Sequence, residues 1–492
     1  MSERLRPRDV ALLAEESAST PMHNATVEIF DPGQSGFDYP QLVRLVQERL
    51  SFVPRYRQRI QTVPGRLANP LWVDDDHFDL GYHVRRSALP RPGSHDQLRE
   101  LVARIVSRPL DRSRPLWEIY FVEGLAHGRV ALLSKSHQVL VDGMHTVDLG
   151  QVLLDKSPEP KELGTDDWRP RGHPSPFGLM AGAVHDSLTD PATVAATART
   201  TTGSVLRGVA DTARSAGRVF DALANRTPSA GSPIIGPLSQ QRRVVAVRTD
   251  LADHRKIREA HGGTVNDVIL ATITGALRAW LLTRSESMHG VSEVRAVVPI
   301  SVIDDEMEAT SLGSQIAAHF VDLPVREPSP VVRLHQVSYS FQAHKETGRA
   351  VAASRLTSIS GFAPATFHAI GSRLAARERR SYQLNVTNVP GPQAPLYAAG
   401  ARMLETYPVP PLLEGHPLAI GVTSYDGHVY YGLTADRDML PDADLLGPCL
   451  RESLDELLDS ATGGRTRAPR GRRRRKAPAK APAKAPGKDE PR

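Results

Sequence analysis

Cysteine is almost absent from this chain of 492 residues, which contains only Cys449. A single cysteine excludes an internal disulfide and any zinc site built on several thiolates. Long apolar runs are also missing, because no stretch of the sequence approaches the roughly 18 to 20 apolar residues that span a bilayer. The N-terminal sequence MSERLRPRDVALLAEE lacks the apolar segment of a secretory signal. These absences favour a globular protein of the reducing cytoplasm.

Acidic residues are scarce at the C-terminus. From Arg465 to Arg492 there are 12 Lys/Arg and two acids, a net charge of +10, so the rest of the chain carries −4 of the total of +6. The AP and AK repeats of this tail predict disorder. A basic tail of this kind can bind anionic lipid or nucleic acid, and without aromatic residues any contact with nucleic acid would not depend on base sequence.

Two domains are expected from the length, since a single core rarely serves so long a chain. Mixed α/β patterns predict an N-terminal domain over residues 1–165 and a C-terminal domain over 236–460. Residues 166–235 are rich in Pro, Ala, Thr and Gly, and we interpret them as a linker with weakly amphipathic helices. A helix on a membrane surface is the alternative interpretation of this segment. Residues 461–492 form the basic tail.

Apolar spacing predicts the main elements of both domains. The expected strands are Ala25–Phe30, Val130–Ser136, Val244–Val247 and Ala296–Pro299. The expected helices are Leu42–Leu50, Leu98–Val106, Met144–Leu154, Thr264–Leu282 and Leu445–Leu458. Thr264, followed three residues later by Asp267, predicts a capping box at the start of the fourth of these helices.

The most informative stretch runs from Lys135 to Gly143 (KSHQVLVDG). It predicts a strand that ends at His137 and Gln138, followed by an Asp142-Gly143 turn that leads into a helix. Glycine lets a backbone approach closely at such a turn, and the aspartate can pair with a distant arginine. Asp142 and Gly143 are therefore expected to shape the turn rather than to react.

Several blocks of this sequence, in the same order, resemble those of the bacterial wax ester synthase/diacylglycerol acyltransferase family, within the CoA-dependent acyltransferase superfamily. Residues 137–143 (HQVLVDG) are similar to the family's HHxxxDG motif. The other similar blocks are Pro21-Met22-His23, Pro115-Leu116-Trp117, Asn266-Asp267, 295–301 (RAVVPIS), 388–392 (NVPGP) and 424–427 (SYDG). Leu312-Gly313-Ser314 departs from the family, which usually has Gly-Asn there. The resemblance covers nearly the whole folded chain.

The resemblance implies an α/β fold of two chloramphenicol-acetyltransferase-like domains, with an interdomain tunnel that passes residues 137–143. It implies O-acyl transfer from a long-chain acyl-CoA to diacylglycerol or a fatty alcohol, which yields triacylglycerol or wax ester. Acyl-CoA is then a substrate, and no metal or other cofactor is expected. We expect a cytoplasmic protein at the periphery of membranes or lipid droplets, with the basic tail 465–492 on the anionic lipid surface.

The second histidine of the family motif is the general base, and this chain has Gln138 at that position. An amide can orient a hydroxyl group but has no protonation equilibrium near neutral pH. Loss of a general base typically costs about 10²- to 10⁴-fold in rate. The sequence therefore leaves open a slow acyltransferase, a catalytically silent homologue that binds acyl-CoA or lipid, and acyl transfer to some other hydroxyl group.

Other histidines near the motif are weaker candidates for the base. Neighbouring side chains on a strand point to opposite faces, so His137 would need a local bulge to replace Gln138, and a buried structural role is the simpler interpretation. His145, in the first turn of the next expected helix, is an alternative base that the helix dipole would keep neutral. His23 is assigned no chemistry.

Among the supporting residues, Asn266 and Asp267 could polarise the site, although helix capping explains Asp267 adequately. Trp117 is expected in the core, beside Pro115 and Leu116, because large aromatic side chains are more often packing residues than ligand platforms.

Overall fold

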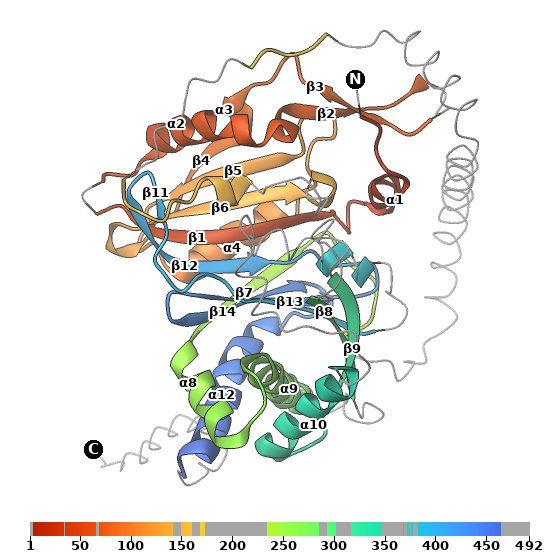
Figure 1. Cartoon of the computed structure of the whole chain (residues 1–492), viewed down its shortest axis with the longest axis vertical. Helices are drawn as coiled ribbons and strands as arrows, with labels where there is room; N and C mark the ends of the chain where they lie inside the picture. Colours follow the sequence, from red (N-terminus) through yellow and green to blue (C-terminus); the bar gives the residue numbers. More distant parts are fainter. Residues whose placement is uncertain are drawn as a thin grey trace, which may run out of the picture.

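Two six-stranded sheets organise the chain, one above the other in Figure 1, with helices packed against each. The structure is a computed structural model, and it describes residues 3–33, 35–64, 68–140, 149–159, 168–172, 234–284, 293–301, 316–345, 368, 371–373, 375–376 and 382–463.

The first sheet has the strand order β11-β12-β1-β6-β5-β4. Its strands are β1 (His23–Asp31), β4 (Val84–Ala88), β5 (Trp117–Glu123), β6 (Val130–His137), β11 (Tyr397–Ala398) and β12 (Ala401–Val409). All neighbouring strands are antiparallel except β4 and β5. The helices of this half are α1 (Pro7–Glu15), α2 (Tyr39–Arg49), α3 (Leu80–His83), α4 (His95–Val106) and α5 (Leu149–Val152), with 3-10 turns η1 (Leu50–Phe52), η2 (Pro54–Arg57), η4 (Ala126–Gly128) and η5 (Gln138–Leu140). A separate hairpin pairs β2 (Gln58–Gln61) with β3 (Leu71–Asp74).

The second sheet has the strand order β7-β14-β13-β10-β8-β9. Its strands are β7 (Arg242–Asp250), β8 (Val294–Ser301), β9 (Ile316–Leu323), β10 (Leu384–Val389), β13 (Leu418–Tyr425) and β14 (His428–Asp436). The helices on the face away from the first sheet are α8 (Leu251–His261), α9 (Val265–Thr283), α10 (Pro330–Lys345) and α12 (Leu446–Thr462), the last preceded by η8 (Ala443–Leu445) (Figure 1). One apolar core joins this face to the helices.

Local sequence explains how helices α4 and α9 begin. At α4, the Ser94 side chain accepts from the Gln97 backbone N–H, and the Gln97 side chain bonds back to the Ser94 N–H. Thr264 and Asp267 form the same capping box at α9, as the sequence predicts. These reciprocal bonds satisfy backbone donors that a helix start otherwise leaves unpaired.

The structure confirms the predicted elements where it describes them. The four expected strands lie within β1, β6, β7 and β8, and the expected helices correspond to α2, α4, α9 and α12. Of the helix expected over Met144–Leu154, the described residues contain α5, while residues 141–148 lie outside them. Most of the 166–235 segment, Leu312 to Ser314 and the basic tail from residue 464 also lie outside the described residues.

Helix α9 is apolar enough to need a separate explanation. Within the described residues it is the helix that is long and apolar enough to cross a membrane, by length and composition alone. However, 72% of its apolar window is buried inside the protein. Leu270, Ile273 and Leu277 pack in the core of the second sheet, so the hydropathy of α9 is explained by burial within the protein.

The first sheet is completed by residues from the C-terminal part of the chain, which the predicted division at residues 165 and 236 does not include. Strand β12 pairs with β1, for example Val409 with Ala25. A Cβ atom on Gly432 of β14 would lie 1.7 Å from the Pro408 carbonyl oxygen. Only glycine leaves room for such an approach, so β12 lies directly on the second sheet.

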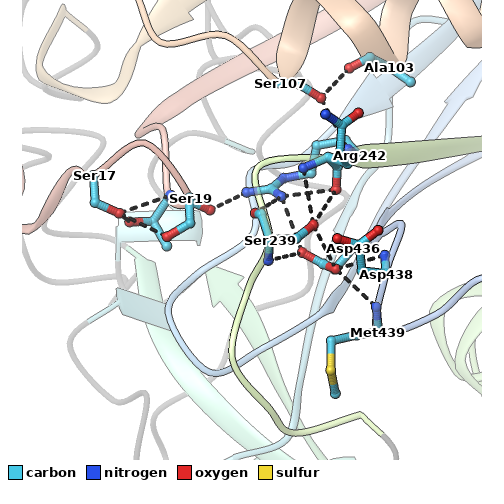
Figure 2. A network of polar contacts seen from close by, with 11 residues as sticks. Ser17, Ser19, Ala103, Ser107, Ser239, Arg242, Asp436, Asp438 and Met439 are labelled. Atoms are coloured by element: carbon cyan, nitrogen blue, oxygen red, sulfur yellow. Dashed lines mark hydrogen bonds and ion pairs between the residues drawn. The ribbon is translucent and has the colours of Figure 1, made fainter. Parts of the chain in front are cut away.

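A buried ion pair also ties the two halves together (Figure 2). Arg242 at the start of β7 lies 3.4 Å from Asp436 at the end of β14. The same guanidinium donates to the Ser19 carbonyl oxygen of the first half, and the Arg242 backbone N–H donates to the Ser107 hydroxyl at 3.1 Å. Asp436 also accepts hydrogen bonds from Ser239 and from backbone N–H groups after β14. Arg242 and Asp436 therefore form a pin between the halves, with both charges compensated.

Candidate active site

The end of β6 holds His137 and Gln138 between two of the sequence blocks identified above. The His137 backbone N–H donates to the Leu116 carbonyl oxygen at 2.9 Å, and the Gln138 N–H donates to the Met22 carbonyl oxygen at 2.9 Å. The Pro21-Met22-His23 and Pro115-Leu116-Trp117 blocks are thus the two neighbours that fix this backbone. Their proximity to the motif comes from strand pairing, since His23 lies opposite His137.

Both nitrogens of the buried His137 ring face groups of the protein. Its Nδ1 accepts a hydrogen bond from the Val139 backbone N–H at 3.1 Å, so the ring proton sits on Nε2. That Nε2 lies 3.6 Å from a carboxylate oxygen of Glu16. A ring whose acceptor nitrogen is occupied by the backbone has no lone pair ready for a substrate proton, which favours a structural role for His137.

Glu16 is the charged partner of His137 and is a site residue that sequence reasoning missed. Its carboxylate accepts from the Arg112 guanidinium at 2.9 Å and from the Met22 backbone N–H at 3.2 Å. Burial would raise the pKa of Glu16, but contacts with His137 and Arg112 outweigh it and lower the pKa to about 2. A negative Glu16 therefore fixes the orientation of the His137 ring.

Two other side chains of the same strand face close the end of helix α4. The Lys135 ammonium donates to the Arg108 carbonyl oxygen at 2.6 Å and to that of Ile105 at 3.3 Å. His23 Nε2 donates to the Val106 carbonyl oxygen at 3.0 Å. Burial lowers the pKa of Lys135 to about 8, against the attraction of Glu118, and burial together with Lys135 holds the pKa of His23 well below its usual range. These groups satisfy the carbonyls that a helix end leaves unpaired, and they have a structural role.

Gln138 differs from its neighbours because its side chain is completely buried and yet lacks partners. Its exposed fraction is 0%, and neither amide atom has a hydrogen-bond partner within the described residues. The amide can donate to one oxygen and accept from another, but it cannot take up a proton near neutral pH. Gln138 is therefore a buried amide at the end of β6 whose hydrogen-bonding capacity the described residues leave free.

Pro115, Leu116 and Trp117 support the site from the first sheet. The Trp117 ring stacks on His83 with centroids 4.5 Å apart, and its Nε1 donates to the Tyr56 carbonyl oxygen at 2.6 Å. Only 1% of Trp117 is exposed, so the predicted packing role is confirmed. The block therefore acts through its backbone, by fixing the end of β6.

Asn266 and Asp267 lie at the start of α9, in the second half. Asp267 bonds its own helix start and also accepts from the Ser338 hydroxyl at 3.2 Å, so capping accounts for its carboxylate. Asn266 accepts from the Asn388 side chain at 2.8 Å. This bond joins the predicted Asn-Asp block to the NVPGP block, although neither residue has a contact with Gln138 among the described residues.

His368, in the C-terminal half, is a further buried histidine that could act as a base. Its Nδ1 lies 2.6 Å from the Thr387 hydroxyl on β10, and its Nε2 has no partner within the described chain. Burial lowers the pKa of His368 to about 3. The ring is therefore neutral near pH 7, but so weak a base accepts a proton from an alcohol poorly.

The remaining predicted site residues cannot be placed beside Gln138. Asp142, Gly143 and His145 lie outside the described residues, and their roles stay predictions. Among the residues that the structure describes, no group of three or more His, Cys, Asp or Glu side chains could hold a metal ion.

The site lies where the two halves meet. Met22, whose carbonyl oxygen holds Gln138, packs in one apolar cluster with Val297 of β8, Tyr382 and Leu413. Substrate groups at Gln138 would therefore lie between the first sheet and the β8–β10 part of the second.

Solved structures with a similar arrangement of elements define the fold. The wax ester synthase/diacylglycerol acyltransferase from Marinobacter aquaeolei VT8 superposes with a TM-score of 0.66 at 24% identity, covering 94% of this chain and all of that chain. The first condensation domain of the calcium-dependent antibiotic synthetase superposes with a TM-score of 0.51 at 15% identity, over 94% of this chain and 97% of that one. The chain thus has the two-domain α/β fold of acyltransferases and condensation domains, as predicted, while the interdomain tunnel stays a prediction.

Sequence comparison identifies the family. The model of the wax ester synthase/diacylglycerol acyltransferase catalytic domain matches residues 5–269, and that of the WS/DGAT C-terminal domain matches residues 312–458. The chain belongs to this family. It is 32% identical over 435 residues to the "probable diacyglycerol O-acyltransferase tgs1" of Mycobacterium tuberculosis, covering 88% of this chain and 90% of that protein. It is 40% identical over 261 residues to tgs3 of the same organism, given the same description, over 52% of this chain and 96% of that protein.

Proposed function

We propose that the protein is an O-acyltransferase that moves a long-chain acyl group from acyl-CoA to diacylglycerol or a fatty alcohol. The products are triacylglycerol or wax ester. The observation that carries the proposal is the match of both family domains, together with relatives named for diacylglycerol acyl transfer. The bonds of two motif blocks, through Met22 and Leu116, to the backbones of Gln138 and His137 are consistent with it.

In this reaction the acceptor hydroxyl oxygen bonds to the thioester carbonyl carbon, and the carbon–sulfur bond breaks. The hydroxyl proton ends on the departing CoA thiol, so the exchange needs no further reagent. Gln138 orients the hydroxyl group by hydrogen bonding, and the confined geometry supplies proximity. The missing base lowers the rate by a factor on the order of 10² to 10⁴, which leaves a slow enzyme rather than none.

The surroundings of the reaction follow from its substrates. Acyl-CoA is the activated substrate, so the proposed reaction needs no metal or prosthetic group. Diacylglycerol and fatty alcohols partition into lipid, which places a cytoplasmic enzyme at the periphery of membranes or lipid droplets. The basic tail 465–492, with its net charge of +10, would bind the anionic surface there.

The test measures product from labelled palmitoyl-CoA with diacylglycerol or hexadecanol, using the native protein and Gln138→His in parallel. Turnover by the native protein supports the proposal, and its loss in His145→Ala would identify a displaced base. A silent native protein beside an active Gln138→His variant would contradict it, and would indicate a homologue that binds acyl-CoA or lipid without chemistry. If labelled product forms only with another hydroxyl compound, that compound is the acceptor in place of diacylglycerol or a fatty alcohol.

A further inference from the structure

Three buried amide side chains lack hydrogen-bond partners near the contact between the two halves. They are Asn24, Gln138 and Asn385, with exposed fractions of 8%, 0% and 1%. Neither the oxygen nor the nitrogen of any of the three has a partner within the described residues. A buried amide without partners is costly, because it has lost its bonds to water and gained none in return. Three in one region indicate polar groups kept for a ligand.

Asn24 and Gln138 belong to one side of the strand pair β1–β6. Asn24 lies opposite Ser136, and the Gln138 backbone bonds to Met22, two residues before Asn24. Alternation along a strand places Met22 and Asn24 on one face and His23 on the other. His23 bonds to the end of α4. Asn24 therefore lies on the face away from that helix, the face to which Met22 also belongs.

Asn385 lies on the second half and reaches the same region. On β10 it pairs with Val297 of β8, so both side chains share one face of the sheet. Its neighbours Leu384 and Val386 point the other way, into the core beneath the helices. Val297 packs in the cluster that contains Met22. Asn24 is thus the next residue after Met22 on the same face of its strand, and Asn385 lies beside Val297. Met22 and Val297 pack in one apolar cluster at the boundary between the two halves.

We propose that Asn24 and Asn385, together with Gln138, form a three-amide site that hydrogen-bonds the uncharged oxygens of the acyl-transfer substrates. These are the thioester carbonyl and the hydroxyl of the lipid alcohol. Each amide offers two donors and one acceptor and carries no charge, which suits carbonyl and hydroxyl groups rather than phosphates. The inference rests on the proposed function and extends its site to the second half of the molecule. Asn24 and Asn385 act by binding and positioning.

The first experiment replaces the unpaired amides by apolar side chains of similar size, in Asn385→Leu and Asn24→Leu, with Asn385→Val as a second variant. An apolar side chain removes the desolvation cost of a buried amide without partners, so we expect the melting temperature to rise by a few degrees or to stay unchanged. The kcat/KM for acyl transfer to diacylglycerol should fall at least about tenfold, since substrate-positioning bonds are lost. Asn69→Leu is the matched control, because Asn69 is buried but donates to the Leu5 carbonyl oxygen at 3.2 Å.

The control should lower the melting temperature and leave the kcat/KM of the folded protein unchanged. Stable Asn385 variants with native kcat/KM would overturn the proposal, as would an equal loss of kcat/KM in Asn69→Leu.

A second readout separates this inference from the proposed function. Dioctanoylglycerol should raise the melting temperature of the native protein and of Asn69→Leu, but not that of Asn385→Leu or Asn24→Leu. If the native protein shows this pattern but turns over no acyl-CoA, the three-amide site is supported and the proposed acyltransferase function is rejected. An equal rise in all four proteins, or none in the native protein, would reject the site even if acyl transfer is found.

Discussion

The two faces of the β1–β6 strand pair differ in how far their buried polar side chains are paired, although His23 Nδ1 and His137 Nε2 on the face toward α4 also lack a hydrogen bond within the described chain. On the face toward α4, His23, Lys135 and His137 are each held by a helix carbonyl, a backbone N–H or a carboxylate. On the other face Asn24 and Gln138 have no partner within the described chain. Paired groups fix the end of a strand in one position, while buried polar groups without partners make the fold less stable. The comparison teaches that the face toward α4 stabilises the strand ends, while the opposite face carries the proposed substrate site.

The largest effect should come from Gln138→His, which would place a titratable group on the unpaired face. We expect kcat to rise by about 10²- to 10⁴-fold, because a general base replaces an amide. The rate should increase with pH through about 6.5, where the imidazole becomes neutral. Gln138→Asn keeps an amide and should gain nothing. A native kcat equal to that of Gln138→His, in assays of initial rate against pH, would show that the base is supplied elsewhere.

The second effect tests the Arg242–Asp436 pin between the two halves. Asp436→Ala leaves the buried Arg242 without its charge partner, so the free energy of unfolding should fall by about 3 to 5 kcal/mol. Urea denaturation followed by circular dichroism measures it. The matched control is Asp444→Ala, since the Arg243–Asp444 pair is 28% and 50% exposed and its loss should cost about 0 to 1 kcal/mol. Similar losses in both variants would contradict a special role for the buried pair.

The third effect concerns how far Glu16, the partner of His137, stabilises the folded protein against acid. The pKa of Glu16 is about 2 in the folded protein against 4.5 ordinarily, so its contribution is present above pH 4.5 and is lost as the pH falls through 2. The contribution is at most about 3 kcal/mol. Glu16→Gln should therefore unfold less steeply with acid over this range than the native protein does. Parallel acid titrations of the two proteins would reject the Glu16–His137–Arg112 contact as the cause.

The smallest effect is expected at the end of α4. Lys135→Met removes the donor to two carbonyl oxygens while keeping the length of the side chain, which should cost about 1 to 3 kcal/mol of unfolding free energy. The kcat per folded molecule should stay near the native value, since Lys135 lies on the face away from Gln138. A stable Lys135→Met with a much lower kcat would break the division between the two faces.

Local patterns were sufficient to predict four of the strands and the helices α2, α4, α9 and α12, and β6 ends at His137, as the sequence predicts. Apolar spacing defines β1, β6 and α9, and the capping box of α9 is visible in Thr264 and Asp267. Contacts between distant residues were not predictable in the same way. Glu16 reaches His137, and Arg242 reaches Asp436, only because strands pair across the fold.

The unpaired amides show a second limit of sequence reasoning. Asn24 and Asn385 stand within strand-like sequence and carry no motif of their own. Whether a buried amide has a partner depends on all of its neighbours in space, so no local pattern distinguishes Asn385 from the paired Asn69. A polar residue within a predicted strand is a candidate binding residue, but only the register of both sheets shows which groups surround it.

The place of β12 in the first sheet has a consequence for biosynthesis. Strand β1 leaves the ribosome early, yet its partner ends at Val409, so one edge of β1 stays unpaired while nearly all of the chain is made. Open strand edges promote aggregation, and pairings between distant residues form slowly. A fragment that stops before residue 401 would expose that edge permanently. The two halves are therefore one unit of folding, and quality control in the cell must deal with the whole chain rather than with either domain alone.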